Sequence, residues 1–345
     1  MFKIQPLAVF KTLLFIVILV VIASCGREPA HMGFAFYNVE NLFDTIDDPR
    51  INDNSYLPDS KIPWNTKRYN TKLNHLAEVM SNTDTTSGYP VLFGLCEIEN
   101  IHVLKDLVNH PKLKNAEYQI VHHDSPDERG IDVALLYQEK YFTPVKYSFL
   151  TLHFPFSPDS KTRDILYTKG ILAKKDTLHV FINHWTSRWG GREETDPKRK
   201  FTGEFLKSVT DSILRLNPAA NILIAGDLND NPTDPSVAEK LGALPVTTKI
   251  IRQELYNLSL AGYAKGDGTL YYKSWDMFDQ IIVSGNLLFK NNIVHVSSPE
   301  QRIIKYDWML YQPENGPARP NRTASGKYFG GYSDHLPVFI DLEVK

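Results

Sequence analysis

The sequence predicts a layered α/β fold, with sheets at the centre and helices outside. Short apolar runs that end in polar residues indicate buried strands at 34–39, 90–96, 131–137, 165–173, 178–184, 221–226, 278–284 and 335–342. Two segments have apolar residues spaced by three and four, as on one helix face: Tyr69, Leu73, Leu76 and Met80, then Phe201, Phe205, Val209, Ile213 and Leu216. No repeat with a period of about 20 to 50 residues is visible, so a repeat architecture is not expected.

The chain begins with the pattern of a secretory signal. Lys3 and Lys11 accompany an apolar run at 13–22, which is too short to cross a bilayer of about 30 Å comfortably. The following Ile22-Ala23-Ser24-Cys25 resembles the lipobox of bacterial lipoproteins, whose cysteine carries the lipid. We therefore expect a signal peptide at 1–25 with Cys25 as the anchor, a tether at 26–32 and one domain at 33–345. An ordinary cleaved signal or an uncleaved anchor helix is the alternative. Each of these exports the protein, and an anchored form would lie at the outer membrane or its periplasmic face.

Composition narrows the class of the folded domain. With 42% hydrophobic and 12% aromatic residues, the chain can build one large core, and we expect a monomer. The net charge of -2 argues against a protein that binds nucleic acid mainly by neutralising its backbone, although a nuclease that contacts a few phosphates stays possible. If Cys25 carries lipid, Cys96 is the single remaining thiol, so a disulfide framework is excluded. Cys96 follows an apolar run and is expected to pack in a strand.

Two long segments rich in turn-forming residues, at 45–66 and about 304–330, are expected to be loops. Long loops in a compact domain often select the substrate, but a plain surface insertion is an equal alternative for each.

Polar or ionisable residues gather at the ends of six predicted strands. Because strand ends in layered α/β folds open onto one rim, where ligands usually bind, their positions together suggest a single site. The clusters are Tyr37-Asn38-Val39-Glu40-Asn41, Glu97-Ile98-Glu99-Asn100, Asn183-His184-Trp185-Thr186-Ser187-Arg188, Gly226-Asp227-Leu228-Asn229, Phe278-Asp279-Gln280 and Tyr332-Ser333-Asp334-His335-Leu336-Pro337.

With these clusters in this order, the sequence resembles the endonuclease/exonuclease/phosphatase family over about residues 33–343. The Gly-Asp-Leu-Asn at 226–229 and the Ser-Asp-His at 333–335 carry the resemblance most strongly. The resemblance implies a four-layered α/β/β/α sandwich with two central mixed sheets. It also implies a divalent-metal-dependent phosphoester hydrolase that uses in-line attack of water on phosphorus.

A carboxylate at a strand end suits an oxygen-preferring cation such as Mg²⁺, with Mn²⁺ or Ca²⁺ as alternatives. By resemblance, Glu97 is the principal metal ligand, with Asn38 and Asp334 nearby. Glu40 and Glu99 are left out of this set, because alternation along a strand points some of these side chains away.

The resemblance also implies catalytic roles. His335 would act as general base, oriented by Asp279, and His184 would stabilise phosphoryl charge or protonate the leaving group, with Asp132 as a weaker candidate for its orienting partner. Asp227 and Asn229 lie two residues apart on an extended segment, so we expect their side chains to face the same way, toward water and phosphate. Whether Asp227 or the His335 pair takes the proton stays open.

Other histidines lack such a context. His122 and His123 have no carboxylate or cysteine at ligand spacing, so no zinc site is expected there.

Three functions remain open at this stage. A nuclease or other phosphodiesterase is favoured, because Arg188 lies beside Trp189 and Arg192 near His184, and Arg129, Lys67 and Arg68 offer further phosphate contacts, although a solvated loop is an equal reading. The second candidate is a phosphatase or lipid phosphodiesterase of the inositol 5-phosphatase or sphingomyelinase type. A binding lipoprotein without turnover comes last, because the catalytic set is complete.

Overall fold

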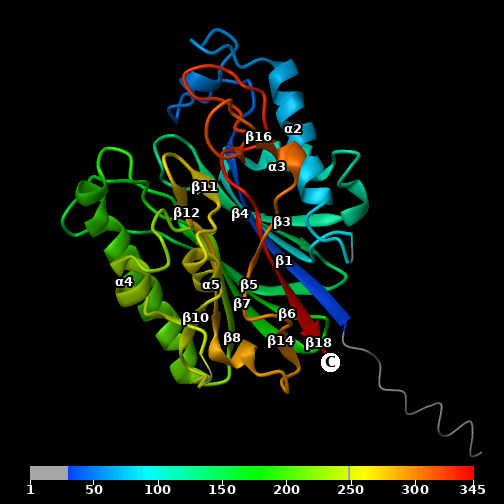
Figure 1. The fold of residues 1–345 in the computed structure, drawn as a ribbon, viewed down its shortest axis with the longest axis vertical. Helices are drawn as coiled ribbons and strands as arrows, with labels where there is room; N and C mark the ends of the chain where they lie inside the picture. Colours follow the sequence, from blue (N-terminus) through cyan, green and yellow to red (C-terminus); the bar gives the residue numbers. More distant parts are fainter. Residues whose placement is uncertain (1–29, 87, 248) are drawn as a thin grey trace, which may run out of the picture.

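Two seven-stranded sheets pack face to face between outer helices in the computed structural model, which describes residues 30–86, 88–247 and 249–345. Figure 1 shows α4 on one flank and α2 and α3 on the other, with the sheets between them. The expected four-layered α/β/β/α sandwich with mixed sheets is thereby confirmed. The signal sequence and Cys25 lie outside the described residues.

The first sheet has the strand order β14-β18-β1-β2-β4-β3, and β15 also pairs with β18. Its strands β1 and β2 run parallel, whereas β18 lies antiparallel to β1 and β4 lies antiparallel to β2. The bounds are β1 Ala30–Leu42, β2 Leu92–Ile98, β3 Tyr118–His122, β4 Asp132–Gln138, β14 Val294–Val296, β15 Arg302–Ile303 and β18 Val338–Val344.

The second sheet has the order β5-β6-β7-β8-β13-β10-β9, in which β7 and β8 run parallel. Its bounds are β5 Phe142–Leu150, β6 Ile165–Leu172, β7 Asp176–His184, β8 Asn221–Asp227, β9 Ala243–Pro245, β10 Leu255–Asn257 and β13 Asp279–Ser284. Two small hairpins lie outside both sheets: β11 Leu270–Tyr271 with β12 Trp275–Asp276, and β16 Leu310–Tyr311 with β17 Arg319–Pro320.

Alternation along the strands produces the layers. On β1, Phe34 and Phe36 point into the core between the sheets, whereas Ala35 and Tyr37 point into the outer core beneath α2 and α3. The helices are α2 Thr66–Ser81, α3 Ile101–Val108, α4 Arg192–Leu216 and the short α5 Leu260–Ala264. The α4 helix covers the outer face of the second sheet, where Leu206 packs in a third core.

Both helices that cover the first sheet, α2 and α3, begin after a residue whose side chain caps them. The side chain of Asn65 accepts a hydrogen bond from the Arg68 backbone N–H at the start of α2, and Asn100 accepts from two N–H groups at the start of α3. These oxygens satisfy N–H groups that the first helical turn leaves without partners. Among the described residues, no helix is both long and apolar enough to cross a membrane.

The expected strands and both expected helices are present, but two expectations change. The segment 30–32 is not tether: it opens β1, because its backbone pairs with the end of β18, from Ala30 opposite Val344 to Met32 opposite Leu342. In α4, the most buried positions are offset from the expected apolar face. Leu216 is 88% exposed, and the inner stripe is Arg199, Thr202, Gly203, Leu206, Thr210 and Leu214. Arg199 can lie there because it pairs with the carboxylate of Asp230.

Candidate active site

The site lies where strands of both sheets end at one rim. Asn38 and Glu97 stand near the carboxyl ends of the parallel strands β1 and β2, and His184 and Asp227 end the parallel strands β7 and β8. Asp279 begins β13, directly opposite Asp227 in an antiparallel pair, which brings it to the same rim.

Five of the expected side chains converge between the sheets. The amide Nδ2 of Asn38 donates to Glu97 Oε1 at 3.1 Å and to Asp227 Oδ2 at 3.0 Å. His184 Nε2 lies 3.9 Å from Glu97 Oε1 and 3.7 Å from Asp227 Oδ2, and His335 Nε2 lies 3.8 Å from the same Asp227 oxygen. Residues far apart in the sequence, from Asn38 to His335, are therefore brought into one polar cluster.

A backbone irregularity aims Glu97 at this cluster. Between Cys96 and Ile98 the pairing of β2 with β4 shifts register, so Glu97 is an extra residue in the strand, with a left-handed φ of +64°. Such a bulge turns a side chain away from the alternation of the strand. A left-handed φ is costly for a residue with a Cβ, and strained backbone of this kind tends to gather at functional sites.

The same turn interrupts β1 near its end and follows β8. Asn38 Oδ1 accepts the N–H of Glu40 at 2.9 Å, and Asp227 Oδ1 accepts the N–H of Asn229 at 2.9 Å. In both turns a left-handed residue follows, Glu40 at +50° and Asn229 at +51°. Asp227 and Asn229 do lie close together, as expected. The reason is this turn, because β8 ends at Asp227 and the alternation of an extended strand does not continue to Asn229.

Gly226 lets these two strands come close beside the site. A Cβ at Gly226 would lie 2.4 Å from the backbone oxygen of Asn183 on β7, which no side chain tolerates. The glycine before Asp227 is therefore a packing requirement that keeps Asp227 near His184.

Asp279 holds the ring of His335. His335 Nδ1 donates to Asp279 Oδ2 at 2.6 Å in a fully buried contact, which leaves Nε2 facing Asp227. Burial lowers the pKa of His335, but the negative charges of Asp279 and Asp227 outweigh it and raise that pKa well above the usual value. Burial raises the pKa of Asp227 to about 7, against the opposing charge of His335.

His184 is held through its backbone carbonyl, and no carboxylate of the described residues lies at the Nδ1 of its ring. Arg163, only 4% exposed, donates from Nε to the His184 carbonyl at 3.2 Å, and His184 Nδ1 has no hydrogen-bond partner. Burial and the positive charges of Arg163 and Arg129 hold the pKa of His184 well below its usual value. His184 is thus a neutral imidazole at neutral pH.

The proposed partner of His184, Asp132, pairs with another histidine. Asp132 Oδ2 lies 3.2 Å from His122 Nε2, and Asp124 is close enough to form a group of three possible metal ligands with them. The expectation that His122 lacks carboxylate neighbours was therefore wrong, because β3 and β4 pair and bring Asp132 across from the next strand. Asp132 Oδ2 lies against His122 and its Oδ1 accepts the Ser125 N–H, so in this structure Asp132 links these neighbours and does not reach His184.

Glu97 offers the most suitable oxygen donors for a cation. Its carboxylate is held by Asn38 and by the Asn41 N–H, its side chain is 16% exposed, and no lysine or arginine pairs with it among the described residues. An oriented, uncompensated carboxylate at the open rim fits a divalent cation. Asn38 has its oxygen engaged by Glu40 N–H and turns its amide nitrogen inward, so here it orients Glu97 and does not present a ligand atom. Asp334 receives Arg322 Nη2 at 3.0 Å.

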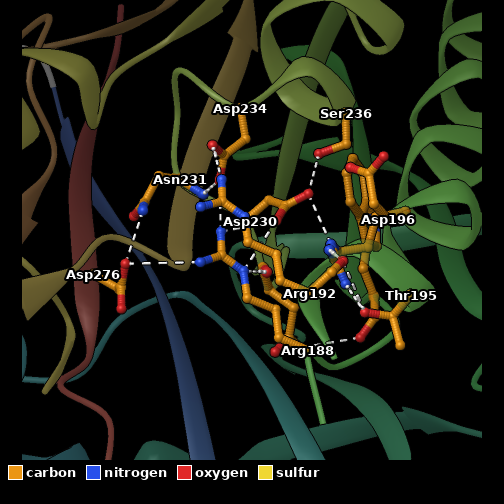
Figure 2. A network of polar contacts seen from close by, with 12 residues as sticks. Arg188, Arg192, Thr195, Asp196, Asp230, Asn231, Asp234, Ser236 and Asp276 are labelled. Atoms are coloured by element: carbon orange, nitrogen blue, oxygen red, sulfur yellow. Dashed lines mark hydrogen bonds and ion pairs between the residues drawn. The ribbon is translucent and has the colours of Figure 1, made fainter. Parts of the chain in front are cut away.

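Arg188 was expected to contact substrate, but in the structure its guanidinium is bound by other side chains of the protein. Its guanidinium lies 2.8 Å from Asp230 Oδ1 and 2.6 Å from Asp234 Oδ2, and its Nε donates to the backbone oxygen of Asn229 at 2.9 Å. Figure 2 shows this network of arginines and aspartates behind the rim. Two carboxylates neutralise Arg188, so its role is to hold the Asn229 turn. Asn229 also donates from Nδ2 to the Trp185 carbonyl at 3.0 Å, which leaves one amide hydrogen for a ligand.

Arg129 remains available to a substrate. Its side chain is 51% exposed, its one ion pair, with Asp127, is 3.4 Å long, and its charge acts on His184. The sequence reading missed the buried Arg163 and Asp127 pair that braces the β7 end. It could have been suspected because Arg163 lies two positions before the apolar run at 165–173.

Comparison with known proteins agrees with this geometry. A family model described as Endonuclease/Exonuclease/phosphatase family matches residues 33–344. Among curated proteins, none matches the chain. Similar solved structures include a Bacteroides thetaiotaomicron VPI-5482 mannosyl-6-phosphatase, with 16% identity over 90% of this chain and 99% of that one, at a TM-score of 0.55. D. rerio TDP2 with a single-strand DNA product has 14% identity over 91% and 99%, at 0.54. The human Nocturnin catalytic domain has 15% identity over 91% and 95%, at 0.53. At these identities the likeness establishes the fold.

Proposed function

Because the chain belongs to the Endonuclease/Exonuclease/phosphatase family, whose members are divalent-metal-dependent phosphoester hydrolases, we propose that it is a phosphodiesterase that cleaves nucleic acid. The observation that carries the proposal is the convergence of Glu97, Asp227, His184 and His335, which are joined by three contacts of less than 4 Å: Glu97 to His184, His184 to Asp227, and Asp227 to His335. Mg²⁺ is the proposed cation, with Mn²⁺ or Ca²⁺ as alternatives.

Glu97 would hold the cation, with Asp334 as a second oxygen donor once it is released from Arg322. When bound, a divalent cation draws charge from phosphoryl oxygens and makes phosphorus more open to attack. Every remaining step falls to the side chains of the chain itself.

The Asp227–His335 pair takes the proton of the attacking water. Asp227 is buried beside His335 Nε2, and Asp279 fixes the opposite ring nitrogen, so the pair is held in one orientation before substrate binds. The free amide hydrogen of Asn229 and the neutral ring of His184 stabilise the phosphoryl oxygens. Arg129 is the proposed substrate contact beside His184.

The proposed lipid anchor on Cys25 favours an aqueous substrate over a membrane lipid. Strand β1 starts at Ala30, five positions after Cys25 in the sequence, and reaches the site at Asn38, which is eight residues on and roughly 26 Å away at the rise of an extended strand. Figure 1 shows the start of β1 at the end of the molecule opposite the loops around the rim. An anchored protein at the cell envelope would thus present its site away from the bilayer. Replacing Cys25 by alanine should release the protein from the membrane fraction.

A phosphatase is the second candidate, because a similar fold is found in a mannosyl-6-phosphatase. The two are separated by measuring hydrolysis of bis-p-nitrophenyl phosphate, p-nitrophenyl phosphate, single-stranded DNA, RNA and sphingomyelin, with Mg²⁺ and with EDTA. We expect the diesters to be cleaved in the presence of Mg²⁺ and to remain uncleaved in EDTA. His335→Ala should lower the rate about 10²- to 10⁴-fold, and the exposed His102→Ala is the matched control. Diester turnover that survives chelation, or preference for the monoester, would contradict the proposal.

A further inference from the structure

A cavity of about 480 Å³ opens beside the catalytic centre, between the β11–β12 and β16–β17 hairpins. We call it the hairpin pocket, and the lining residues used below are Tyr272, Tyr311, Phe329, Arg319, Lys327 and Asp334. A further lining cation, Arg322, is already paired with Glu40 and Asp334. Its walls come from the long loop at 304–330 and from a hairpin that the sequence did not predict, and the proposed mechanism uses none of its aromatic residues.

The aromatic rings of the pocket are exposed to an unusual degree. Tyr272 is 77% exposed, Tyr311 is 50% exposed and Phe329 is 48% exposed. Single exposed aromatic residues are common on protein surfaces, but several around one cavity mark a binding surface. Their flat faces suit a flat, apolar ligand group.

Positive charges lie against these rings and lack acidic partners. Arg319 lies 5.4 Å from the Tyr311 ring centre and Lys327 lies 5.0 Å from that of Phe329, and neither forms an ion pair with any described residue. Lys273 lies 5.8 Å from the Tyr272 ring and is likewise without an ion pair in the described part of the chain. In a chain whose net charge is -2, this local surplus of cations indicates an anionic ligand.

Two residues link the pocket to the catalytic centre. Asp334 lines its wall and is followed directly by His335, which contacts Asp227. Leu270 at the start of the β11–β12 hairpin pairs with His335 through a β-bridge. The pocket is therefore the neighbouring cavity toward which a ligand bound at His335 would extend.

Flat apolar faces alternating with unpaired cations match the bases and phosphates of a single strand. We propose that the hairpin pocket binds unpaired nucleotides next to the scissile phosphate, and so makes single-stranded nucleic acid the substrate. This inference rests on the proposed function. The bases of a duplex are turned toward each other and stacked, so their faces are less open to such rings, and the net charge of -2 offers no overall positive field for a duplex backbone.

Binding is tested with the full folded domain in EDTA, by fluorescence anisotropy of a labelled eight-nucleotide single strand. Loss of one stacking contact should weaken binding roughly 10-fold in Tyr272→Ala and in Phe329→Ala, with recovery in Tyr272→Trp. The control is Tyr147→Ala, a tyrosine on β5 of the second sheet whose exposure of 57% lies between those of Phe329 and Tyr272, and this variant should bind as the wild type does. Arg319→Ala and Lys327→Ala should each reduce the salt dependence of binding by about 0.7 in log–log slope.

Turnover then separates this inference from the proposed function. In Mg²⁺, Tyr272→Ala should lose more activity on the oligonucleotide than on bis-p-nitrophenyl phosphate, because the small diester cannot span the pocket. Equal losses on both, a duplex or mannose 6-phosphate that competes as well as the strand, or wild-type binding by both alanine variants would overturn the pocket proposal. It would leave diester hydrolysis standing. Absence of turnover on every diester, with strand binding intact, would instead refute the proposed function.

Discussion

Two polar clusters lie side by side at the rim of the sandwich, and they differ in how their charges are matched. In the Arg188 network, Asp230 receives Arg188, Arg199 and Ser236, so each of its oxygens is satisfied. In the catalytic cluster, Asp227 faces the His335 ring, and Glu97 has no lysine or arginine partner among the described residues. The comparison teaches that the first cluster holds the chain in place, whereas the second leaves the Glu97 charge uncompensated for a ligand.

The largest expected difference is between two isosteric substitutions three residues apart. Asp227→Asn should lower diester hydrolysis about 10²- to 10⁴-fold because the proton-accepting pair is lost. Its thermal stability should equal or exceed that of the wild type, since a buried charge is removed. Activity assays and calorimetry on the metal-free protein measure both. A clear loss of stability would break the comparison, because it would make Asp227 a structural residue.

Asp230→Asn should behave in the opposite way. It leaves two arginines of the network without their shared carboxylate, one of them fully buried, and should lower the free energy of unfolding by about 3–5 kcal/mol. Urea denaturation measures this loss. Retention of wild-type stability would show that Arg199 finds another partner and that the network is not the brace described above.

Arg188→Lys sharpens the link between the clusters. A lysine cannot donate at once to Asn229, Asp230 and Asp234, so the Asn229 turn should loosen. We expect activity to fall about 10-fold and stability to fall by about 1–2 kcal/mol. The matched control is Arg192→Lys, which keeps its single exposed pair with Asp234 and should change little. Equal effects in both variants would contradict the positioning role.

The smallest expected effect concerns the second buried histidine of β7, far from the rim. Burial and Lys169 lower the pKa of His179 to about 4. The unfolded chain binds a proton near pH 6.5, so the stability from neutral His179 is present above that pH and is lost as pH falls toward 4. His179→Gln should flatten the loss of melting temperature over this range without altering the pH profile of activity. An altered activity profile would mean that β7 transmits protonation to His184.

Much of the fold was readable because its signals are local. Eight apolar runs marked the long strands, and spacing marked α2 and α4. The strands that escaped notice, such as the short β9, β10 and β14, have only three residues each, too few for a periodic signal. The exposed β5 escaped because it is an edge strand with little apolar alternation.

The residue types of the site could likewise be read from strand ends, but their partners could not. Nothing local in the sequence shows that Asp132 pairs with His122, that Arg188 forms ion pairs with Asp230 and Asp234, or that Glu97 lies in a β-bulge. Each of these depends on which strand lies beside which, and that is settled by the packing of the two sheets.

The sequence by itself determined the layered class, the chemical types at the rim and the family, because apolar period and strand-end polarity are properties of short segments. Only the tertiary structure decided which charges are paired and which stay free for a ligand. The physical reason is that pairing depends on distances of a few ångströms between residues as far apart as Asn38 and His335, and those distances arise when the sheets pack.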